Sequence, residues 1–284
     1  MGRVNTAIRL GQHGGVKPLL DETAKYIHEE IVKKVIRLLS RLDDPRPLYR
    51  KYVAFRRRLQ PQKFTDADPF KIIWVDPSEI EYGEKTTTGY GWGRVEDGNW
   101  DRSTELIEGL EGITAHFKHG VPWTETQRFQ KKVNRIRRGK TSKGCASAEE
   151  LEARYKEIDK LYETIRKNGY QPQRTIIKEN PLKHSHLFYK SGEILHPELD
   201  EVKVTIGRDG QILHRHDGRH RLAIAKLLDI ESIPVVVRTR HLHWQEVRDD
   251  YVNKMKGKRD NSDRFSLYKC HPDLYDITQG STEK

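Results

Sequence analysis

The stretch HRHDGRHRLAIAKLLDIESIPVVVRTRH, residues 214–241, decides the fold because it contains signals for a turn, a helix and a strand in succession. Asp217 and Gly218 indicate a turn, and the apolar positions after them predict a helix over residues 219–228. The run IPVVV at 233–237 is apolar throughout, which indicates a buried strand. We therefore expect a turn and a helix that lead into the core of a sheet.

The start of this helix is expected to bind phosphate. A helix N-terminus presents free backbone N–H groups, and a glycine there lets a ligand approach the backbone closely. Arg219 and Arg221 would lie on the first turn, where a cation is unfavourable to the helix dipole unless an anion lies nearby. We therefore assign phosphate binding to Asp217, Gly218, Arg219, His220 and Arg221.

Two other interpretations of the same segment remain open. Histidines and arginines in a basic segment are often only solvated surface. His214 and His216 would share one face of a strand, and His220 could converge from the helix start, so three imidazoles could bind a metal ion. We rank phosphate first, solvated surface second and a metal third, and we assign no metal site.

The composition is that of a basic protein with a modest core. The chain has 284 residues and a formal net charge of +11, with 35% hydrophobic and 33% charged residues. This length predicts one core with appendages, and the positive charge favours polyanionic partners such as nucleic acid or nucleotides. Cys145 and Cys270 are too few for a disulfide framework or a cysteine zinc site. Without a signal peptide or a membrane-span signal, we expect a cytoplasmic location.

The pattern of elements divides the chain into three parts. An N-terminal helical extension is expected over residues 1–69, a mixed domain over 70–256 and a polar tail over 257–284. A helical insertion is expected within the domain at about 103–146. Besides the quoted segment, the expected helices cover residues 18–42, 103–118, 124–138, 147–168 and 244–255, and the expected strands cover 70–75, 174–178, 202–206 and 212–215.

The expected helix over 124–138 is the candidate nucleic-acid surface. Thr124 and Gln127 have the spacing of a capping box at its start. A basic helix surface of this kind can neutralise backbone phosphates. The residues assigned to nucleic-acid binding are Arg128, Lys131, Lys132, Arg135, Arg137 and Arg138, and the basic surface continues through Lys140 and Lys143.

Three segments together resemble the ParB/sulfiredoxin-like superfamily. HDGRHRLAIAKLLDIESIPVVV at 216–237 is similar to its signature turn, helix and strand. LYETIRKNGYQP at 161–172 resembles its upstream box, and IIWVDPSEI at 72–80 resembles its first strand and turn. The resemblance spans about residues 70–240, with the insertion as an interruption. It implies an α+β fold, with a mixed sheet, flanking helices and a bound nucleotide.

At several positions this chain differs from the superfamily's patterns, and these differences exclude some of the functions found in the superfamily. Sulfiredoxins have a cysteine where this chain has Arg219, which excludes repair of sulfinic acid. Chromosome-partition proteins have an arginine where this chain has Ala223, and no helix-turn-helix pattern follows residue 240. The local pattern is most similar to the Asp-Gly-x-His-Arg turn of free-serine kinases, a turn that is also similar to that of many ParB-like nucleases.

In the kinase branch, the resemblance implies that Asp217, Gly218, His220 and Arg221 cradle nucleotide phosphates. It also implies a carboxylate base in the loop after the first strand. Glu84 falls near that place in the sequence, and Asp101 is the competing candidate. Phosphoryl transfer needs positioning, neutralisation of charge and a group that accepts the hydroxyl proton.

Three functional hypotheses follow. The favoured one is an enzyme that binds a nucleoside di- or triphosphate, with or without Mg²⁺, and transfers phosphate to a small hydroxyl acceptor or hydrolyses it. The second is a DNA- or RNA-binding protein or nuclease, in which Glu84 or Asp101 holds a divalent metal. The third is a binding module that a nucleotide switches between two conformations.

Overall fold

The computed structural model describes residues 44–85, 91–102, 104–107, 110–179, 196–257 and 267–278, together with residues 34 and 42. The helix expected over 18–42 lies outside these ranges except for those two single residues. The expected α+β class is confirmed, because the described chain combines helices with one seven-stranded mixed sheet. A topology specific to the ParB/sulfiredoxin-like superfamily stays a prediction.

The sheet is built around its longest strand, β7. Its strand order is β1-β7-β5-β6-β2-β4, and β3 pairs with β7 beside this path. All nine residues of β7 are buried, because the apolar run that predicted it lies in the middle of the sheet. The strands are β1 (Ile72–Val75), β2 (Tyr82–Glu84), β3 (Arg94–Glu96), β4 (Thr104–Leu106), β5 (Val202–Ile206), β6 (Ile212–His214) and β7 (Ile233–His241).

The hairpin expected at Asp209 and Gly210 is confirmed. Strands β5 and β6 are antiparallel, with Ile206 opposite Ile212. Gly210 has a φ of 82°, a left-handed conformation that the turn requires. The chain then passes through α8 and returns as β7, parallel to β5. The predicted succession of turn, helix and core strand is therefore present.

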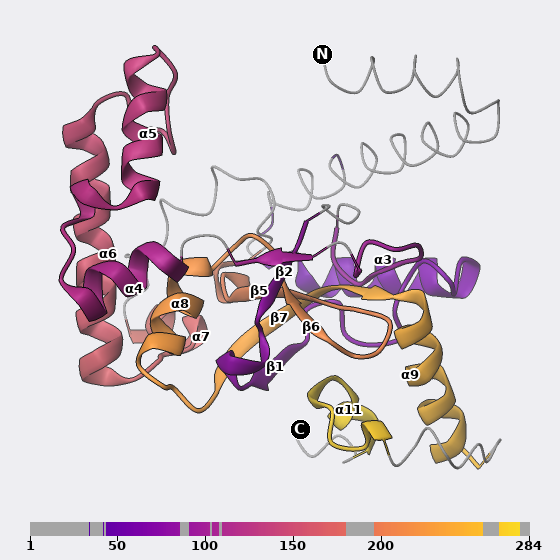
Figure 1. Cartoon of the computed structure of the whole chain (residues 1–284). Coiled ribbons are helices and arrows are strands. Elements are labelled where there is room, and N and C mark those ends of the chain that lie inside the picture. Colours follow the sequence, from indigo (N-terminus) through magenta and orange to yellow (C-terminus); the bar gives the residue numbers. More distant parts are fainter. Residues whose placement is uncertain are drawn as a thin grey trace.

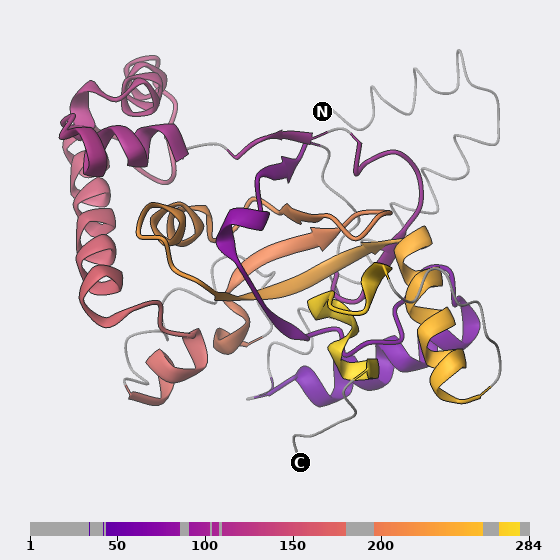
Figure 2. The same cartoon turned by 60° about the horizontal axis from the view of Figure 1, so that its bottom comes forward.

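Helices surround the sheet on several sides. Helices α4, α5 and α6 form a group beyond α8, whereas α3 and α9 lie at the opposite side of the molecule (Figures 1 and 2). The helices are α3 (Arg46–Leu59), α4 (Leu110–His119), α5 (Gln127–Arg137), α6 (Ala148–Asn168), α7 (Gln173–Glu179), α8 (Arg219–Leu227), α9 (Leu242–Met255) and α11 (Tyr275–Thr278).

Helix α8 is buried from two directions. Leu222 and Ala225 belong to the core between the sheet and helices α8 and α9. Ala223 and Ile224 belong to a different core, which they share with side chains of α4, α5 and α6. The helix therefore holds the helical group against the sheet. A third core packs α3 against the sheet through Val236.

Helix α6 has the ends that its sequence predicts. The Ser147 hydroxyl accepts a hydrogen bond from the Glu150 backbone N–H at 3.2 Å, and the Glu150 carboxylate accepts one from the Ala146 N–H at 2.7 Å. Gly169 follows the last residue with a φ of 72°. These local interactions explain why the helix over 147–168 was predictable.

Three local predictions are wrong. Residues 174–178 form part of helix α7, where the Thr175 and Ile176 N–H groups bond to the Pro172 carbonyl. The helix expected from Ser103 begins only at Leu110, because the preceding residues form β4 and pair with β2. The N-cap of helix α5 is Thr126 rather than Thr124, and the Thr126 hydroxyl accepts a hydrogen bond from the Phe129 N–H. Tertiary pairing overrides local propensity at β4.

Residues 267–278, which fall within the expected polar tail, pack against the domain. Asp273 is fully buried and accepts hydrogen bonds from the Arg240 guanidinium at 2.8 and 2.5 Å. It also accepts one from the Trp244 indole N–H at 3.0 Å and lies 3.5 Å from Arg248. Burial alone would raise the pKa of Asp273, but the two arginines hold it well below its usual range.

We predict that Asp273→Asn destabilises the fold strongly. The change leaves Arg240 and Arg248 buried without their shared carboxylate, which is expected to lower the free energy of unfolding by about 3–5 kcal/mol. Denaturant unfolding measures the loss. The matched control is Glu157→Gln, which breaks an exposed ion pair with Lys160. A loss for Asp273→Asn no greater than that of the control would contradict the prediction.

Candidate anion-binding site

The first turn of α8 has the open geometry that an anion site needs. Gly218 is the N-cap residue, with φ 79° and ψ 7°, and no side chain caps the helix there. A Cβ atom at this position would lie 2.8 Å from the Val202 Cα atom in β5. Glycine is therefore required both by the left-handed backbone and by the close approach of the turn to the sheet.

Asp217 fixes the turn to the sheet. Its carboxylate accepts a hydrogen bond from the Lys203 ammonium at 2.6 Å, and its carbonyl lies 3.0 Å from His214 Nε2. Burial alone would raise the pKa of Asp217, but the nearby Lys203 lowers it, so the side chain is ionised. We infer that Asp217 shapes the turn, and that the cationic side chains nearby are the better candidates for direct contact with phosphate.

Arg221 was expected to bind phosphate, but in the structure its guanidinium lies beside two carboxylates. Its guanidinium lies 3.4 Å from the Asp200 carboxylate and 3.6 Å from that of Glu201, just before β5. Burial disfavours the charged form of Glu201, and the nearby Arg221 offsets this effect only in part. The pKa of Glu201 is therefore raised to about 7. Arg221 therefore serves to attach α8 to the beginning of β5.

Arg219 and His220 lie instead among cations from other elements. The pKa of Lys132 is lowered to about 8 by burial and by the charges of Arg128, Arg219, Lys143 and Arg154. The pKa of His220 is lowered to about 3 by burial and by Arg219, Lys132 and further arginines. We call Arg128, Lys132, Lys143, Arg154 and Arg219 the cation cluster. It brings together the two binding surfaces that the sequence suggested separately.

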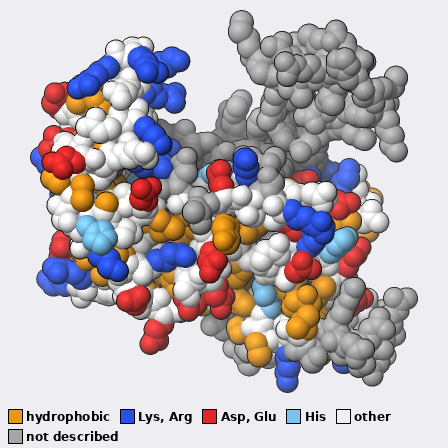
Figure 3. Space-filling view, viewed as in Figure 1, with side chains coloured by type: hydrophobic (Ala, Val, Ile, Leu, Met, Phe, Trp, Pro, Cys, Tyr) orange, Lys and Arg blue, Asp and Glu red, His pale blue; other side chains and the backbone are white. Residues whose placement is uncertain are grey.

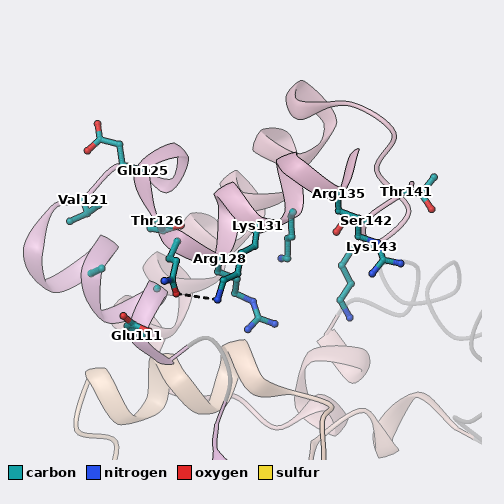
Figure 4. A pocket seen from close by; sticks show the side chains of 14 residues that line it. Glu111, Val121, Glu125, Thr126, Arg128, Lys131, Arg135, Thr141, Ser142 and Lys143 are labelled. Atoms are coloured by element: carbon teal, nitrogen blue, oxygen red, sulfur yellow. Dashed lines mark hydrogen bonds between the residues drawn. The ribbon is translucent and has the colours of Figure 1, made fainter. Parts of the chain in front are cut away.

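A cleft of about 810 Å³ opens beside the cation cluster. Arg128, Lys131 and Lys143 reach toward the same space from α5 and the loop after it, whereas Glu111 lies on the α4 side (Figure 4). Lys and Arg side chains also gather over the α5 end of the molecule (Figure 3). The basic residues that line this α5 cleft are Arg128, Lys131, Lys132, Arg135 and Lys143.

The apolar face of α5 holds its basic face at the cleft. Phe129 and Val133 are buried, and the Phe129 ring packs edge-on against Tyr155 of α6 at 5.2 Å. Trp123, just before α5, donates a hydrogen bond to Asp159 of α6 at 2.7 Å. The sequence predicted the basic surface of this helix, but Arg137 and Arg138 do not line the cleft.

Glu84 lies beside the first turn of α8. Strand β2 runs parallel to β6, with Gly83 opposite His214, which brings the next residue to this end of the sheet. Glu84 is fully buried and lines a hollow of about 20 Å³ together with His214, His216 and Arg219. That volume is about the size needed for one water molecule. Glu84 is therefore the carboxylate that the fold brings to the predicted phosphate turn.

Asp101 lies at the other end of β5, beside the hairpin. It accepts hydrogen bonds from the Arg208 guanidinium at 2.7 and 2.8 Å and from the Arg208 N–H at 2.9 Å. Burial would raise its pKa, but the bonds from Arg208 lower it to about 2. Asp101 thus forms a structural ion pair with Arg208 and is not near the α8 turn.

Sequence reasoning missed Arg154 and Lys203. Arg154 is an exposed residue of α6 directly before the buried Tyr155, so nothing in the sequence separates it from ordinary surface charge. Lys203 lies in a strand that reads as alternating, yet its side chain is buried against Asp217. The alternation of Lys203 with apolar neighbours places it on the polar face of the expected strand, so no sequence signal indicated its burial.

His214, His216 and His220 do not form a metal site, and no group of three or more His, Cys, Asp or Glu side chains among the described residues could hold an ion. Within the same residues, no helix is both long and apolar enough to cross a bilayer.

Comparison with known proteins adds no relative. No protein-family model, curated protein or solved structure matches this chain. The resemblance to the ParB/sulfiredoxin-like superfamily therefore stays a prediction from sequence.

We predict that Gly218→Ala disrupts the α8 turn. The left-handed backbone conformation is less favourable for alanine by about 1–2 kcal/mol, and the added Cβ would also clash with the Val202 backbone. The matched control is Gly257→Ala, which has a φ of 70° but open space around the added atom. Denaturant unfolding should show a larger loss at residue 218 than at residue 257, and an equal loss would show that the contact with Val202 is unimportant.

We also predict that stability falls in mild acid. The pKa of His214 is lowered to about 4, mainly by burial, and that of His220 to about 3. Between these values and about 6.5, each of the two histidines binds more protons in the unfolded chain than in the folded one, so the free energy of unfolding decreases as pH falls. Glu201, with its raised pKa, acts in the opposite direction and offsets part of this loss. The expected loss at pH 5 is up to about 2 kcal/mol for each histidine.

Unfolding at pH 7 and pH 5 tests this dependence. His220→Gln should reduce the pH dependence, whereas His119→Gln, a change at an exposed residue of α4, should leave it unchanged. Equal pH dependence in the native protein and in His220→Gln would show that the imidazole of His220 does not carry the effect.

Proposed function

We propose that this protein binds a nucleoside di- or triphosphate with its phosphates between the start of α8 and the basic face of α5. The observation that carries the proposal is the cation cluster, which joins Arg219 at the uncapped start of α8 to the basic residues that line the α5 cleft. Backbone N–H groups and charged side chains are complementary donors for phosphate oxygens. The cleft volume of about 810 Å³ also suits a ligand of nucleotide size.

The chemistry that fits this site best is transfer or hydrolysis of a nucleotide phosphate. Glu84, beside the α8 turn, is the proposed base that accepts a proton from a small hydroxyl acceptor or from water. The cation cluster would neutralise charge as the phosphoryl group moves. Since the described residues hold no ready set of metal ligands, Mg²⁺ would arrive on the nucleotide phosphates.

A second candidate function is binding of DNA or RNA. Arg137, Arg138 and Lys140 are exposed beyond the α5 cleft and continue its basic surface. A nucleic-acid backbone could contact these residues, whereas a single nucleotide in the cleft would leave them untouched. Dependence of affinity on salt and on Arg137 therefore separates the two functions.

We predict that Arg219→Gln weakens nucleotide binding by a factor of about 10 to 100. The change removes one charged donor at the phosphate site, and a hydrogen bond to a charged group contributes about 1.5–3 kcal/mol. Calorimetric titration with ATP, CTP and GTP, each with and without Mg²⁺, measures the affinity. The matched control is Arg137→Gln, which makes the same change in charge outside both the cleft and the cation cluster.

Equal affinity of the native protein and Arg219→Gln for every nucleotide that binds would contradict the proposed position of the phosphates. If no nucleotide binds, but generic DNA binds with a steep salt dependence and equal losses in the two variants, nucleic-acid binding replaces the proposal.

A further inference from the structure

Lys132 has an unusual position for a basic residue of a surface helix. It lies in the middle of α5, lines the cleft and is half-buried. Its ammonium nitrogen lies 2.9 Å from the Tyr155 hydroxyl and 4.7 Å from the centre of that ring. The nitrogen is therefore held at the cleft wall and is not spread over many conformations, as the end of an exposed lysine would be.

The charges that act on Lys132 come from four parts of the chain, and all are positive. Arg128 belongs to the same helix, Lys143 to the loop after it, Arg154 to α6 and Arg219 to α8. Together with burial, these charges lower the pKa of Lys132 to about 8. Compared with an ordinary lysine, the fraction of neutral amine at pH 7 is then larger by a factor on the order of 100.

We propose that Lys132 is a nucleophilic amine that forms an imine with phosphate-bearing aldehydes in the α5 cleft. A lysine near other cations in a partly dry site is a recurring way to make a reactive amine. The phosphate of such a ligand would be attracted to the same cations, which places its carbonyl group near the amine. The inference rests on the cation cluster used in the proposed function, but it does not require a nucleotide.

The bond changes balance without any oxidant or metal. The lone pair of the neutral Lys132 nitrogen attacks the carbonyl carbon and forms a carbinolamine. The oxygen takes up the two protons that the nitrogen releases and leaves as water, while the nitrogen lone pair forms the carbon–nitrogen double bond. One amine and one aldehyde give one imine and one water. Tyr155 acts as a positioning residue, because its hydroxyl holds the nitrogen at the wall of the cleft.

The test uses pyridoxal 5′-phosphate as the probe on the full chain. After timed incubation at pH 7, borohydride traps the imine, and peptide mass spectrometry locates the adducts. We expect Lys132 to react at least about tenfold faster than Lys160, an exposed lysine of α6. Pyridoxal, which lacks the phosphate, should show a smaller preference for Lys132, and inorganic phosphate should protect it. Modification of Lys132 no faster than Lys160 would overturn the proposal.

Variants separate chemical reactivity from mere exposure. Lys132→Arg keeps the charge and should remove the adduct from that peptide. Arg219→Gln removes one of the cations that lower the pKa, so the midpoint of labelling rate against pH should move upward. Arg137→Gln, outside the cleft, should leave that midpoint in place. An unchanged midpoint in Arg219→Gln would show that the cation cluster does not activate the amine.

The outcomes for the amine and for nucleotide binding are distinguishable. If calorimetry detects no nucleotide binding but Lys132 reacts selectively, the proposed nucleotide function fails and the reactive amine stands. If a nucleotide binds with the expected dependence on Arg219 but Lys132 shows no selective reaction, the nucleotide site stands and the reactive amine is overturned.

Discussion

The candidate site depends on the burial of α8 from two sides. Leu222 and Ala225 face the sheet core, and Ala223 and Ile224 face the helical core, so a short helix connects both. A buried leucine or isoleucine side chain contributes about 1.5–3 kcal/mol, which makes this attachment costly to break. The position of the first turn of α8 relative to α5 is therefore a property of core packing. Surface electrostatics alone would not bring so many like charges together.

The sequence was a good guide wherever a local interaction decides the structure. The Asp-Gly pair at 209–210 specified a hairpin, and the cap residues Ser147 and Gly169 specified both ends of α6. The apolar run after α8 specified the central strand. In each case the residues that make the signal also make the contacts. The open first turn of α8 belongs to the same group, because a glycine before a helix is itself the structural feature.

The roles of individual charges could not be predicted in this way. Arg219 and Arg221 are separated by about 200° around a helix, so one joins the cation cluster while the other pairs with Asp200 and Glu201. The meeting of α5 with the α8 turn depends on a core assembled from segments about 90 residues apart in the chain. The choice between Glu84 and Asp101 likewise depended on strand pairing, which joins β2 to β6 and leaves Asp101 with Arg208.

The pairing of Asp273 with Arg240 and Arg248 has a consequence for the order of folding. Arg240 is synthesised before the carboxylate that neutralises it and ends fully buried, whereas Arg248 also pairs with Asp66, which precedes it in the chain. During translation, an early collapse around β7 would enclose the Arg240 guanidinium without its carboxylate, which is unfavourable. Burial of Arg240 is thus expected to wait until residue 273 has left the ribosome.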